Sequence, residues 1–168
     1  RSSREGFWFG GKVVRGAYLV SERARAKKLG YADPVHANIE ATHECYNAAC
    51  DLIMEEIDHS ELMVASHNEQ SIRYVTQRME ELGIKRRDGG VFFGQLLGMC
   101  DFLTFTLGAN NFSVYKYVPY GPWDQVMPYL VRRAQENSAL LGGDGARKER
   151  RVLREELVRR LTGRGPKN

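Results

Sequence analysis

The stretch Leu62–Ile84, LMVASHNEQSIRYVTQRMEELGI, contains the pattern that decides the fold. Its first part, Leu62–Asn68, is apolar and then abruptly polar, which is typical of a buried strand that ends at a surface. An apolar stripe at helical spacing follows, made of Ile72, Val75, Met79 and Leu82. Gly83 is suited to end that helix, because glycine readily takes the left-handed conformation found there. The stretch therefore predicts a strand that leads directly into a helix.

The same order of elements recurs three more times along the chain. We expect the other strands at Lys12–Tyr18, Gly90–Gly98 and Phe112–Gly121. The helices expected after them cover about 39–57, with Asn38 as N-cap, then 99–111, and then a segment with Val126, Leu130, Val131 and Ala134 as its apolar side. Residues 21–38 predict a polar loop, and a last helix is expected from about Ala146 to Leu161.

Four alternations of strand and helix predict an α/β fold with a parallel sheet and right-handed crossovers. Near-continuous apolar strands indicate that both faces of the sheet are covered. Two architectures remain open at this point, an open doubly wound sheet and part of a (βα)8 barrel. A full barrel takes about 250 residues, so four units would be half of one.

Composition narrows the function classes. The chain has 168 residues and a net charge of +4, and no run approaches the roughly 20 apolar residues of a spanning helix. Its arginine-rich segment, residues 147–161, interleaves arginine with glutamate, which favours a solvated helix over a nucleic-acid site. Cys45, Cys50 and Cys100 lack metal-ligand spacing, so we expect no metal site and reduced thiols, with Cys45 and Cys50 packed inside a helix.

Two neighbouring arginines stand out in YLVRRAQEN, residues 129–137. Tyr129, Arg132, Arg133 and Glu136 share one helix face at i, i+3, i+4 and i+7. Arginine suits bidentate capture of a carboxylate, although a surface ladder of ion pairs would use the same spacing. The nearby tyrosines favour an anion site for a small acid, with Tyr117, Tyr120 and Tyr129 expected to gather around the pair.

Polar residues follow the predicted strands where ligands collect in parallel α/β folds. They are Arg15, Tyr18, Ser66, His67, Gln95 and Tyr117. Gly16 and Ala17 leave the backbone open to a flat ring or a phosphate, but the glycine could also serve only to turn the chain. A lone histidine such as His67 is more often a hydrogen-bonded structural residue than a base.

Taken together and in order, five motifs resemble the proline dehydrogenase family, above all its animal mitochondrial form. They are KVVRGAYL, MVASHNE, FFGQLLGMCD, YKYVPYG and PYLVRRAQEN, spread over residues 11–137. The resemblance implies half of a (βα)8 barrel, strands five to eight, with a helix after the last strand that caps the barrel mouth. It implies a domain over residues 1–143 and a basic helix and tail over 144–168.

The resemblance also implies roles for individual residues. Arg132 and Arg133 match a pair that clamps the substrate carboxylate, and Leu96 matches an apolar contact beside it. The aromatic wall around the proline ring is matched by Tyr18, Tyr117 and Tyr129. The FAD-binding positions are matched by Arg15, Gly16, Ala17, Ser66 and His67, and Glu136 matches a residue that supports the flavin or the arginines. Lys12 stands where bacterial members carry an arginine beside flavin N5, which gives it a catalytic position without the planar fork.

The function implied is the oxidation of L-proline to pyrroline-5-carboxylate by hydride transfer to FAD, with a quinone as the electron acceptor. A mitochondrial location follows, in the matrix or at the inner-membrane face with a possible association with that membrane, and no nucleic-acid partner. One alternative is hydroxyproline dehydrogenase, whose members carry a smaller hydroxyl residue where this chain has Tyr117. A truncated, non-catalytic half-barrel is another, since the resemblance places strands one to four outside this chain. An anion-surface module acting through the arginine-rich tail is a third.

Overall fold

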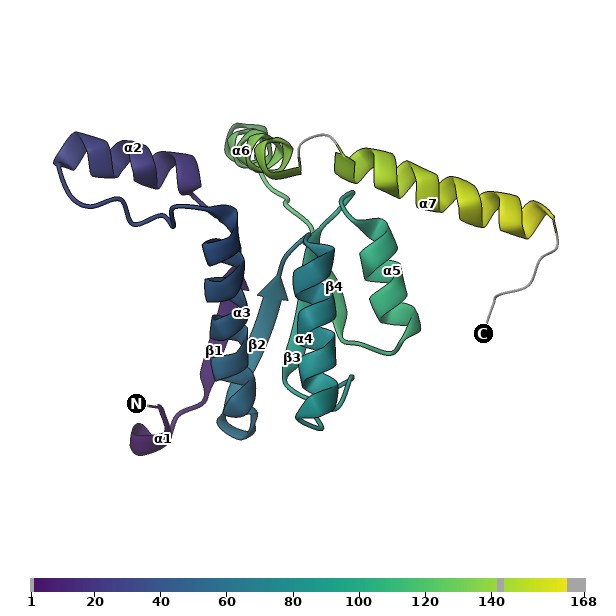
Figure 1. Ribbon diagram of the computed structural model, residues 1–168, viewed down its shortest axis with the longest axis horizontal. Coiled ribbons are helices and arrows are strands. Elements are labelled where there is room, and N and C mark those ends of the chain that lie inside the picture. The colour runs from purple at the N-terminus through teal and green to yellow at the C-terminus, as the bar shows by residue number, and fades with distance from the viewer. Residues whose placement is uncertain (1, 142–143, 163–168) are drawn as a thin grey trace.

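The computed structural model describes residues 2–141 and 144–162. Its strands are β1 (Phe9–Val14), β2 (Ser60–Ala65), β3 (Val91–Leu96) and β4 (Val114–Tyr117). Its α-helices are α1 (Ser2–Glu5), α2 (Leu19–Leu29), α3 (Ile39–Glu55), α4 (Glu69–Glu81), α5 (Asp101–Ala109), α6 (Trp123–Leu141) and α7 (Asp144–Leu161), and a 3-10 turn η1 (Ile57–His59) precedes β2. Figure 1 shows how these elements are arranged.

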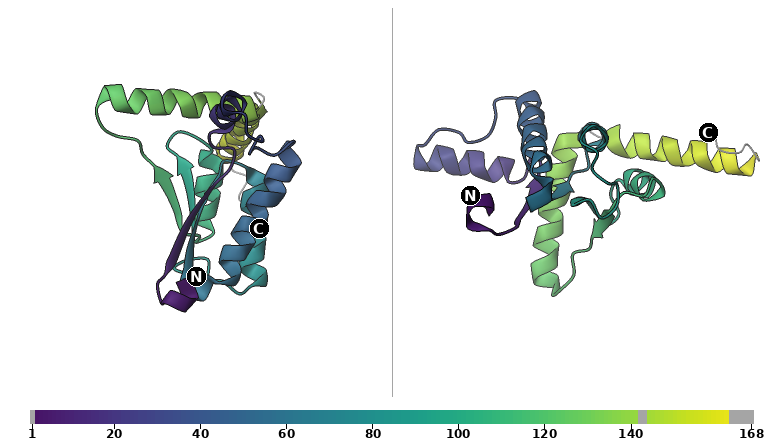
Figure 2. Two further views of the ribbon diagram at one scale, coloured as in Figure 1. Left: turned by 90° about the vertical axis from the view of Figure 1, so that its left-hand side faces the viewer. Right: turned by 90° about the horizontal axis from the view of Figure 1, so that it is seen from below.

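The four strands form one parallel sheet in the order β1-β2-β3-β4. Helices α3, α4 and α5 lie along one face of the sheet, and α6 lies across the carboxyl ends of the strands (Figures 1 and 2). A doubly wound sheet reverses its strand order and carries helices on both faces. The described residues show neither feature, and the prediction of an α/β fold with a parallel sheet is confirmed.

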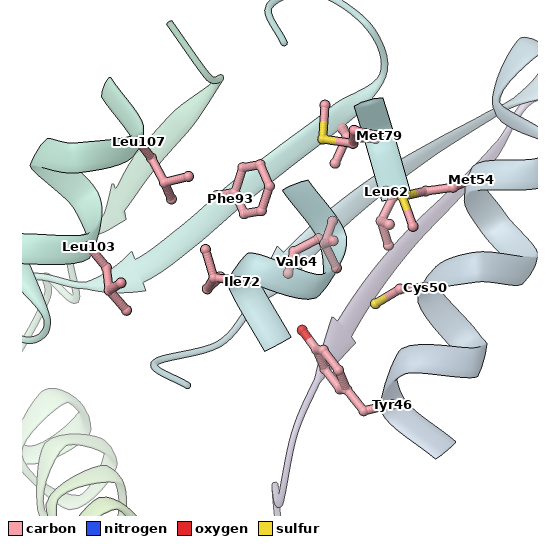
Figure 3. Close-up of a cluster of buried hydrophobic side chains, with 12 residues drawn as sticks. Tyr46, Cys50, Met54, Leu62, Val64, Ile72, Met79, Phe93, Leu103 and Leu107 are labelled. Atoms are coloured by element: carbon pink, nitrogen blue, oxygen red, sulfur yellow. The ribbon is translucent and has the colours of Figure 1, made fainter. Parts of the chain in front are cut away.

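The hydrophobic core lies between the sheet and α3, α4 and α5 (Figure 3). At its centre Phe93 of β3 is 0% exposed, and its ring meets the ring of Phe112 edge-on with 5.8 Å between centroids. The other core side chains include Cys50 and Met54 of α3, Leu62 and Val64 of β2, and Val75 and Met79 of α4. Each large apolar side chain buried in this way contributes about 2 kcal/mol to stability.

Local signals explain where two of the helices begin and end. The side chain of Asn38 accepts a hydrogen bond from the backbone N–H of Ala41 at 2.8 Å, which confirms the predicted N-cap of α3. After α4, Gly83 has a φ of 68°, and the N–H of Ile84 turns back to the carbonyl of Met79 at 2.8 Å. Gly83 therefore ends α4 as predicted, because a left-handed residue is needed there.

Three local predictions were wrong. Residues predicted as a polar loop include helix α2, whose alanine, arginine, lysine and leucine residues favour a helix without an apolar stripe to reveal it. Strand β1 begins earlier than predicted, and it also ends earlier because Gly16 and Tyr18 have φ angles of 68° and 60°, which no strand accommodates. Cys50 is buried in α3, but Cys45 faces outward on the same helix.

The prediction that both faces of the sheet are covered was also wrong for the described residues. Helices cover only one face, and the other, which we call the open face, carries Lys12, Val14, Met63, Ala65, Gly94, Leu96, Tyr115 and Tyr117. All four strands alternate between more and less buried residues, because successive side chains point to opposite faces of the sheet and only one of these faces is covered by helices.

Candidate ligand-binding site

A cavity of about 470 Å³ lies where the open face meets the underside of α6. Its walls come from the ends of all four strands, from the segments that follow β1 and β2, and from α6. The carboxyl end of a parallel sheet is where such folds bind their ligands. The position of the cavity therefore agrees with the sequence-based expectation that polar strand ends form a site.

Small residues of the two central strands form the floor of the cavity. Ala65 of β2 and Gly94 of β3 are paired in the register and both line the cavity. A Cβ atom placed on Gly94 would come within 3.2 Å of the sulfur of Met63. A side chain at this position would therefore crowd Met63 and fill the floor, which glycine leaves open to a planar ligand.

Helix α6 supplies the roof of the cavity through Tyr129 and Arg133, which are one turn apart. The guanidinium of Arg133 lies 5.3 Å from the ring centre of Tyr18 and 5.6 Å from that of Tyr129. The ring of Tyr129 in turn lies 6.0 Å from the ring of Tyr117. Burial, followed by the neighbouring Tyr117, raises the pKa of Tyr129, so its hydroxyl stays protonated. The cation and the three rings form one cluster.

A second cation faces this cluster from the sheet. The amine of Lys12 on β1 lies 5.2 Å from the ring centre of Tyr117 on β4. Together Lys12 and Arg133 give the cavity a positive charge on two sides, with aromatic rings between them. This arrangement suits a small anion with an apolar body, since the cations attract the charge and the rings pack against the remainder.

The loop after β2 is tied to the end of β3 beside the cavity. The backbone N–H of Leu96 donates to Nε2 of His67 at 3.1 Å, so this ring nitrogen carries no proton. The side chain of Gln95 donates to the carbonyl of Ser66 at 3.4 Å and accepts from the hydroxyl of Thr104 at 3.0 Å. These bonds fix His67 and Ser66 in place, as the structural interpretation of a lone histidine requires.

Arg15, just after β1, lies on the side of the cavity nearest the helices. Its Nη1 donates to Nδ1 of His43 on α3 at 3.0 Å and to the hydroxyl of Ser71 on α4 at 3.2 Å. Burial lowers the pKa of Arg15. The next residues, Gly16 to Tyr18, turn the chain along the cavity wall, with Tyr18 held in the left-handed conformation that leads into α2.

The structure brings all but two of the predicted site residues to this cavity. Its walls include Lys12, Arg15, Gly16, Ala17, Tyr18, Ser66, His67, Leu96, Tyr117, Tyr129 and Arg133. Arg132 is exposed on α6 and is not part of the wall. Glu136 belongs to α6, but its side chain lies outside the part of the chain that the structure describes.

Two expectations about the surroundings of the arginines were wrong. Tyr120 does not join the other tyrosines, because its side chain is 91% exposed in the loop before α6. The predicted apolar side of α6 is not its packing side, since Leu130 and Val131 are 38% and 47% exposed. The helix instead turns Tyr129 and Arg133 toward the sheet, so its polar side is the side that contacts the rest of the chain.

Sequence reasoning missed other residues of the wall, among them Met63, Asn68, Gly94, Tyr115 and Lys116. Gly94 carried a usable signal, because a glycine inside an apolar strand often marks the close approach of a ligand. Lys116 carried no such signal. In the structure its amine bonds to Asp101 at 2.6 Å and to the carbonyl of Met99 at 2.7 Å, and these contacts hold the loop after β3.

Across residues 2–141 and 144–162, no cluster of three or more His, Cys, Asp or Glu could hold a metal ion. None of the helices described is both long enough and apolar enough to cross a bilayer.

Helix α7 carries arginine beside glutamate, with Glu156 paired to Arg159 and to Arg160, the latter at 2.8 Å. The paired arginines lower the pKa of Glu156 to about 2.

Comparison with known proteins gives the chain a family. The family model described as proline dehydrogenase matches residues 1–143. The chain is 53% identical to human mitochondrial proline dehydrogenase 1 over 94% of its length and 50% identical to bovine hydroxyproline dehydrogenase over 98%. It covers 26% and 36% of those two proteins, so it spans about a quarter to a third of their length.

A solved structure agrees with these matches. The crystal structure of proline utilization A from Bdellovibrio bacteriovorus, inactivated by N-propargylglycine, superposes with a TM-score of 0.76 at 28% identity. The superposition covers 82% of this chain and 14% of that protein. Sequence and fold therefore agree, and the chain belongs to the proline dehydrogenase family.

Proposed function

We propose that the chain forms the substrate-clamping, flavin-binding part of an enzyme that oxidises L-proline to pyrroline-5-carboxylate. The observation that supports this most is the cavity at the strand ends, where Arg133 and Lys12 face each other across three tyrosine rings. That arrangement matches a small amino acid with one carboxylate and an apolar ring. We place the domain at residues 1–143, the span that the family model matches, followed by a basic segment over 144–168.

We further propose that the four strands are strands five to eight of a (βα)8 barrel. The strand order follows the chain without reversal, and α3, α4 and α5 all lie on one side of the sheet. In a barrel the other side of each strand faces the interior, which would account for an open face rich in small and aromatic residues. Helix α6 would then cap the barrel mouth.

In the proposed complex the substrate carboxylate binds the guanidinium of Arg133, and Arg132 completes a clamp by turning toward the cavity from its exposed position on α6. Tyr18, Tyr117 and Tyr129 pack around the ring, and Leu96 provides an apolar contact from the strand end. The residues have to orient the substrate rather than move protons, and orientation alone can lower a barrier by about 7 kcal/mol or more. Glu136 would support the arginines.

The residues around the floor fit an FAD cofactor. Gly94 and Ala65 leave room for a flat ring system, and Gly16 and Ala17 expose backbone at the edge of the cavity. Arg15, Ser66 and His67 would hold the cofactor by hydrogen bonds, and Lys12 would face its reactive edge with a positive charge. When bound, FAD would supply the oxidising power for the reaction.

Proline is the preferred substrate over hydroxyproline in this proposal. Overall identity does not separate the two, since the chain is 53% identical to a proline dehydrogenase and 50% identical to a hydroxyproline dehydrogenase. Tyr117 favours proline, because its ring stands in the aromatic cluster and leaves little space for a ring hydroxyl. The ratio of kcat/KM for the two substrates measures this preference.

The relatives named mitochondrial support a mitochondrial location, in the matrix or at the inner-membrane face. We propose a quinone as the electron acceptor and a peripheral association with the inner membrane, and no nucleic-acid partner. The ion pairs within α7 favour a solvated helix over an anion-surface module.

The proposal is tested in the full-length protein by adding proline to the purified enzyme without oxygen. The expected result is an absorption band of oxidised flavin that bleaches with proline. A yellow protein that proline leaves unbleached would contradict the proposed reaction. A full-length protein that binds no flavin would support the alternative of a non-catalytic barrel.

A further inference from the structure

Arg15 lies at the cavity wall just after β1. Its side chain is held by two helices, α3 and α4, on the covered face of the sheet. Its Nη1 donates to Nδ1 of His43 at 3.0 Å and to the hydroxyl of Ser71 at 3.2 Å. Neither partner lines the cavity, since His43 lies on α3 and Ser71 is buried on α4. A cation at the cavity wall is thus fixed from behind by residues that no ligand would touch.

The bond between Arg15 and His43 requires one protonation state of the imidazole. A guanidinium has only donors, so Nδ1 of His43 must accept and therefore carries no proton. A protonated imidazole would present an N–H at the same place and a positive charge at hydrogen-bond distance from another one. Acidification would then replace an attraction by a repulsion, and only the bond to Ser71 would remain on this nitrogen.

The side chains that shift the pKa values of the pair lie in the turn after β1 and on α3. Burial lowers the pKa of His43 and Arg15 lowers it further, while Glu40 on the same helix acts in the opposite direction. The pKa of Arg15 is lowered by burial and raised by Tyr46 of α3, and the hydroxyl of Ser71 on α4 that accepts from Arg15 is neutral. The histidine is therefore neutral near pH 7 and gains its proton only in more acidic solution.

We propose that His43 is a positioning residue that holds Arg15 at the cavity wall only in its neutral form, so that mild acid loosens the cofactor site. This inference rests on the proposed function, in which Arg15 helps to hold FAD. It adds a residue outside the cavity and gives the affinity for FAD a dependence on pH.

The test compares FAD affinity in four full-length proteins from pH 8 down to about pH 5.5, which spans the usual range of histidine. His43→Asn keeps an acceptor near the position of Nδ1 but cannot gain a proton. His43→Ala removes the acceptor. His59→Asn is the matched control, because His59 lies in η1, before the amino end of β2 and far from the cavity. The apoprotein is titrated with FAD, and quenching of flavin fluorescence gives Kd.

Wild type and His59→Asn should lose affinity on acidification about fivefold more than His43→Asn does, which corresponds to one hydrogen bond. His43→Ala should bind FAD several-fold more weakly than wild type at pH 8, and this difference should shrink as the solution becomes acidic and wild type loses the same bond. His67 lies in the cavity and is unchanged in all four proteins, so the difference between wild type and His43→Asn isolates His43.

Two results would overturn the inference while leaving the proposed function intact. One is an identical pH dependence of Kd in wild type and His43→Asn, and the other is unchanged affinity of His43→Ala at pH 8. A wild-type protein that binds no FAD at any pH would overturn both the inference and the proposed function.

Discussion

The two faces of the sheet are built from alternate residues of the same strands, yet they differ in almost every property. On the covered face, Leu62, Val64 and Phe93 are 0% exposed and packed against helices. On the open face, their neighbours Met63, Ala65 and Gly94 line a cavity beneath α6. Because side chains alternate along a strand, residues that stabilise the fold and residues that bind a ligand can be adjacent in sequence.

Residues on the covered face and residues that line the cavity should therefore respond differently to substitution. Changes on the covered face should reduce the free energy of unfolding and leave the affinity of the remaining folded protein unchanged. Changes at the open face or on the underside of α6 should alter binding and leave stability nearly unchanged. The full-length protein is the one to be measured in each case.

The largest effect should come from the covered face. Phe93→Ala removes a ring at the centre of the core and should lower the free energy of unfolding by about 3–5 kcal/mol. Urea denaturation measures it. Leu52→Ala is the control, because Leu52 is 68% exposed on α3 and should change stability by less than about 0.5 kcal/mol. Equal losses for both variants would contradict the placement of the core.

The next largest effect should be a loss of substrate binding, caused by a change at the roof of the cavity. Arg133→Met removes the charge and keeps an apolar side chain, and should lower kcat/KM for proline about 100-fold, the equivalent of about 3 kcal/mol for a buried charge pair. The effect should appear mainly as a higher KM. A normal KM would disprove the carboxylate contact.

The neighbouring arginine should have the weaker effect of the two. Arg132 is exposed and must turn toward the cavity to reach a ligand, so Arg132→Met should raise KM for proline by only about tenfold, near the value of one hydrogen bond to a charged group. Steady-state kinetics on both variants gives the comparison. A larger effect at Arg132 than at Arg133 would reverse the roles assigned to them.

Substrate choice should depend on the aromatic cluster. Tyr117→Ser opens space beside Lys12 and Tyr129, and should shift the ratio of kcat/KM for hydroxyproline over proline upward by about tenfold, a typical effect of pocket shape. Competition between the two substrates in one assay measures the ratio directly. An unchanged ratio would mean that Tyr117 does not set specificity.

The smallest effect should be a pure stability change far from the cavity. Asn38→Ala removes the side chain that caps α3 and should cost about 1 kcal/mol of stability. FAD affinity and KM should stay at their wild-type values, since Asn38 is not part of the cavity wall. A change in Kd would show that the start of α3 is coupled to the site.

Much of the fold could be predicted because its signals are local. The structure confirms Ile72, Val75 and Met79 as the buried stripe of α4 and Gly83 as the residue that ends it, whereas Leu82, predicted as part of the stripe, lies just after the helix and is 40% exposed. Helix α2 was missed because it buries little apolar surface and so shows no stripe, although its residues favour a helix. The start of β1 was missed because Gly10 and Gly11 have low strand propensity, and their place in the sheet is set by pairing with β2.

Many residues of the cavity wall could be predicted from the sequence, but their geometry could not. The order of motifs brought together residues from the ends of four strands and from α6. Which of two adjacent arginines lies at the wall depends on how α6 rotates above the sheet, and no pattern in the sequence fixes that rotation. The bond between Arg15 and His43 likewise joins residues 28 positions apart and could not be inferred from spacing.

The central contact of the proposed site is the ion pair between Arg133 and the substrate carboxylate at the open face. The measurement that tests it compares kcat/KM for proline and for prolinamide, which lacks the carboxylate charge, in wild type and Arg133→Met. Wild type should strongly prefer proline, and the variant should lose that preference by at least about tenfold, because the charge it recognises no longer has its partner. If the variant prefers proline over prolinamide as strongly as wild type does, Arg133 does not hold the carboxylate and the proposed site is wrong.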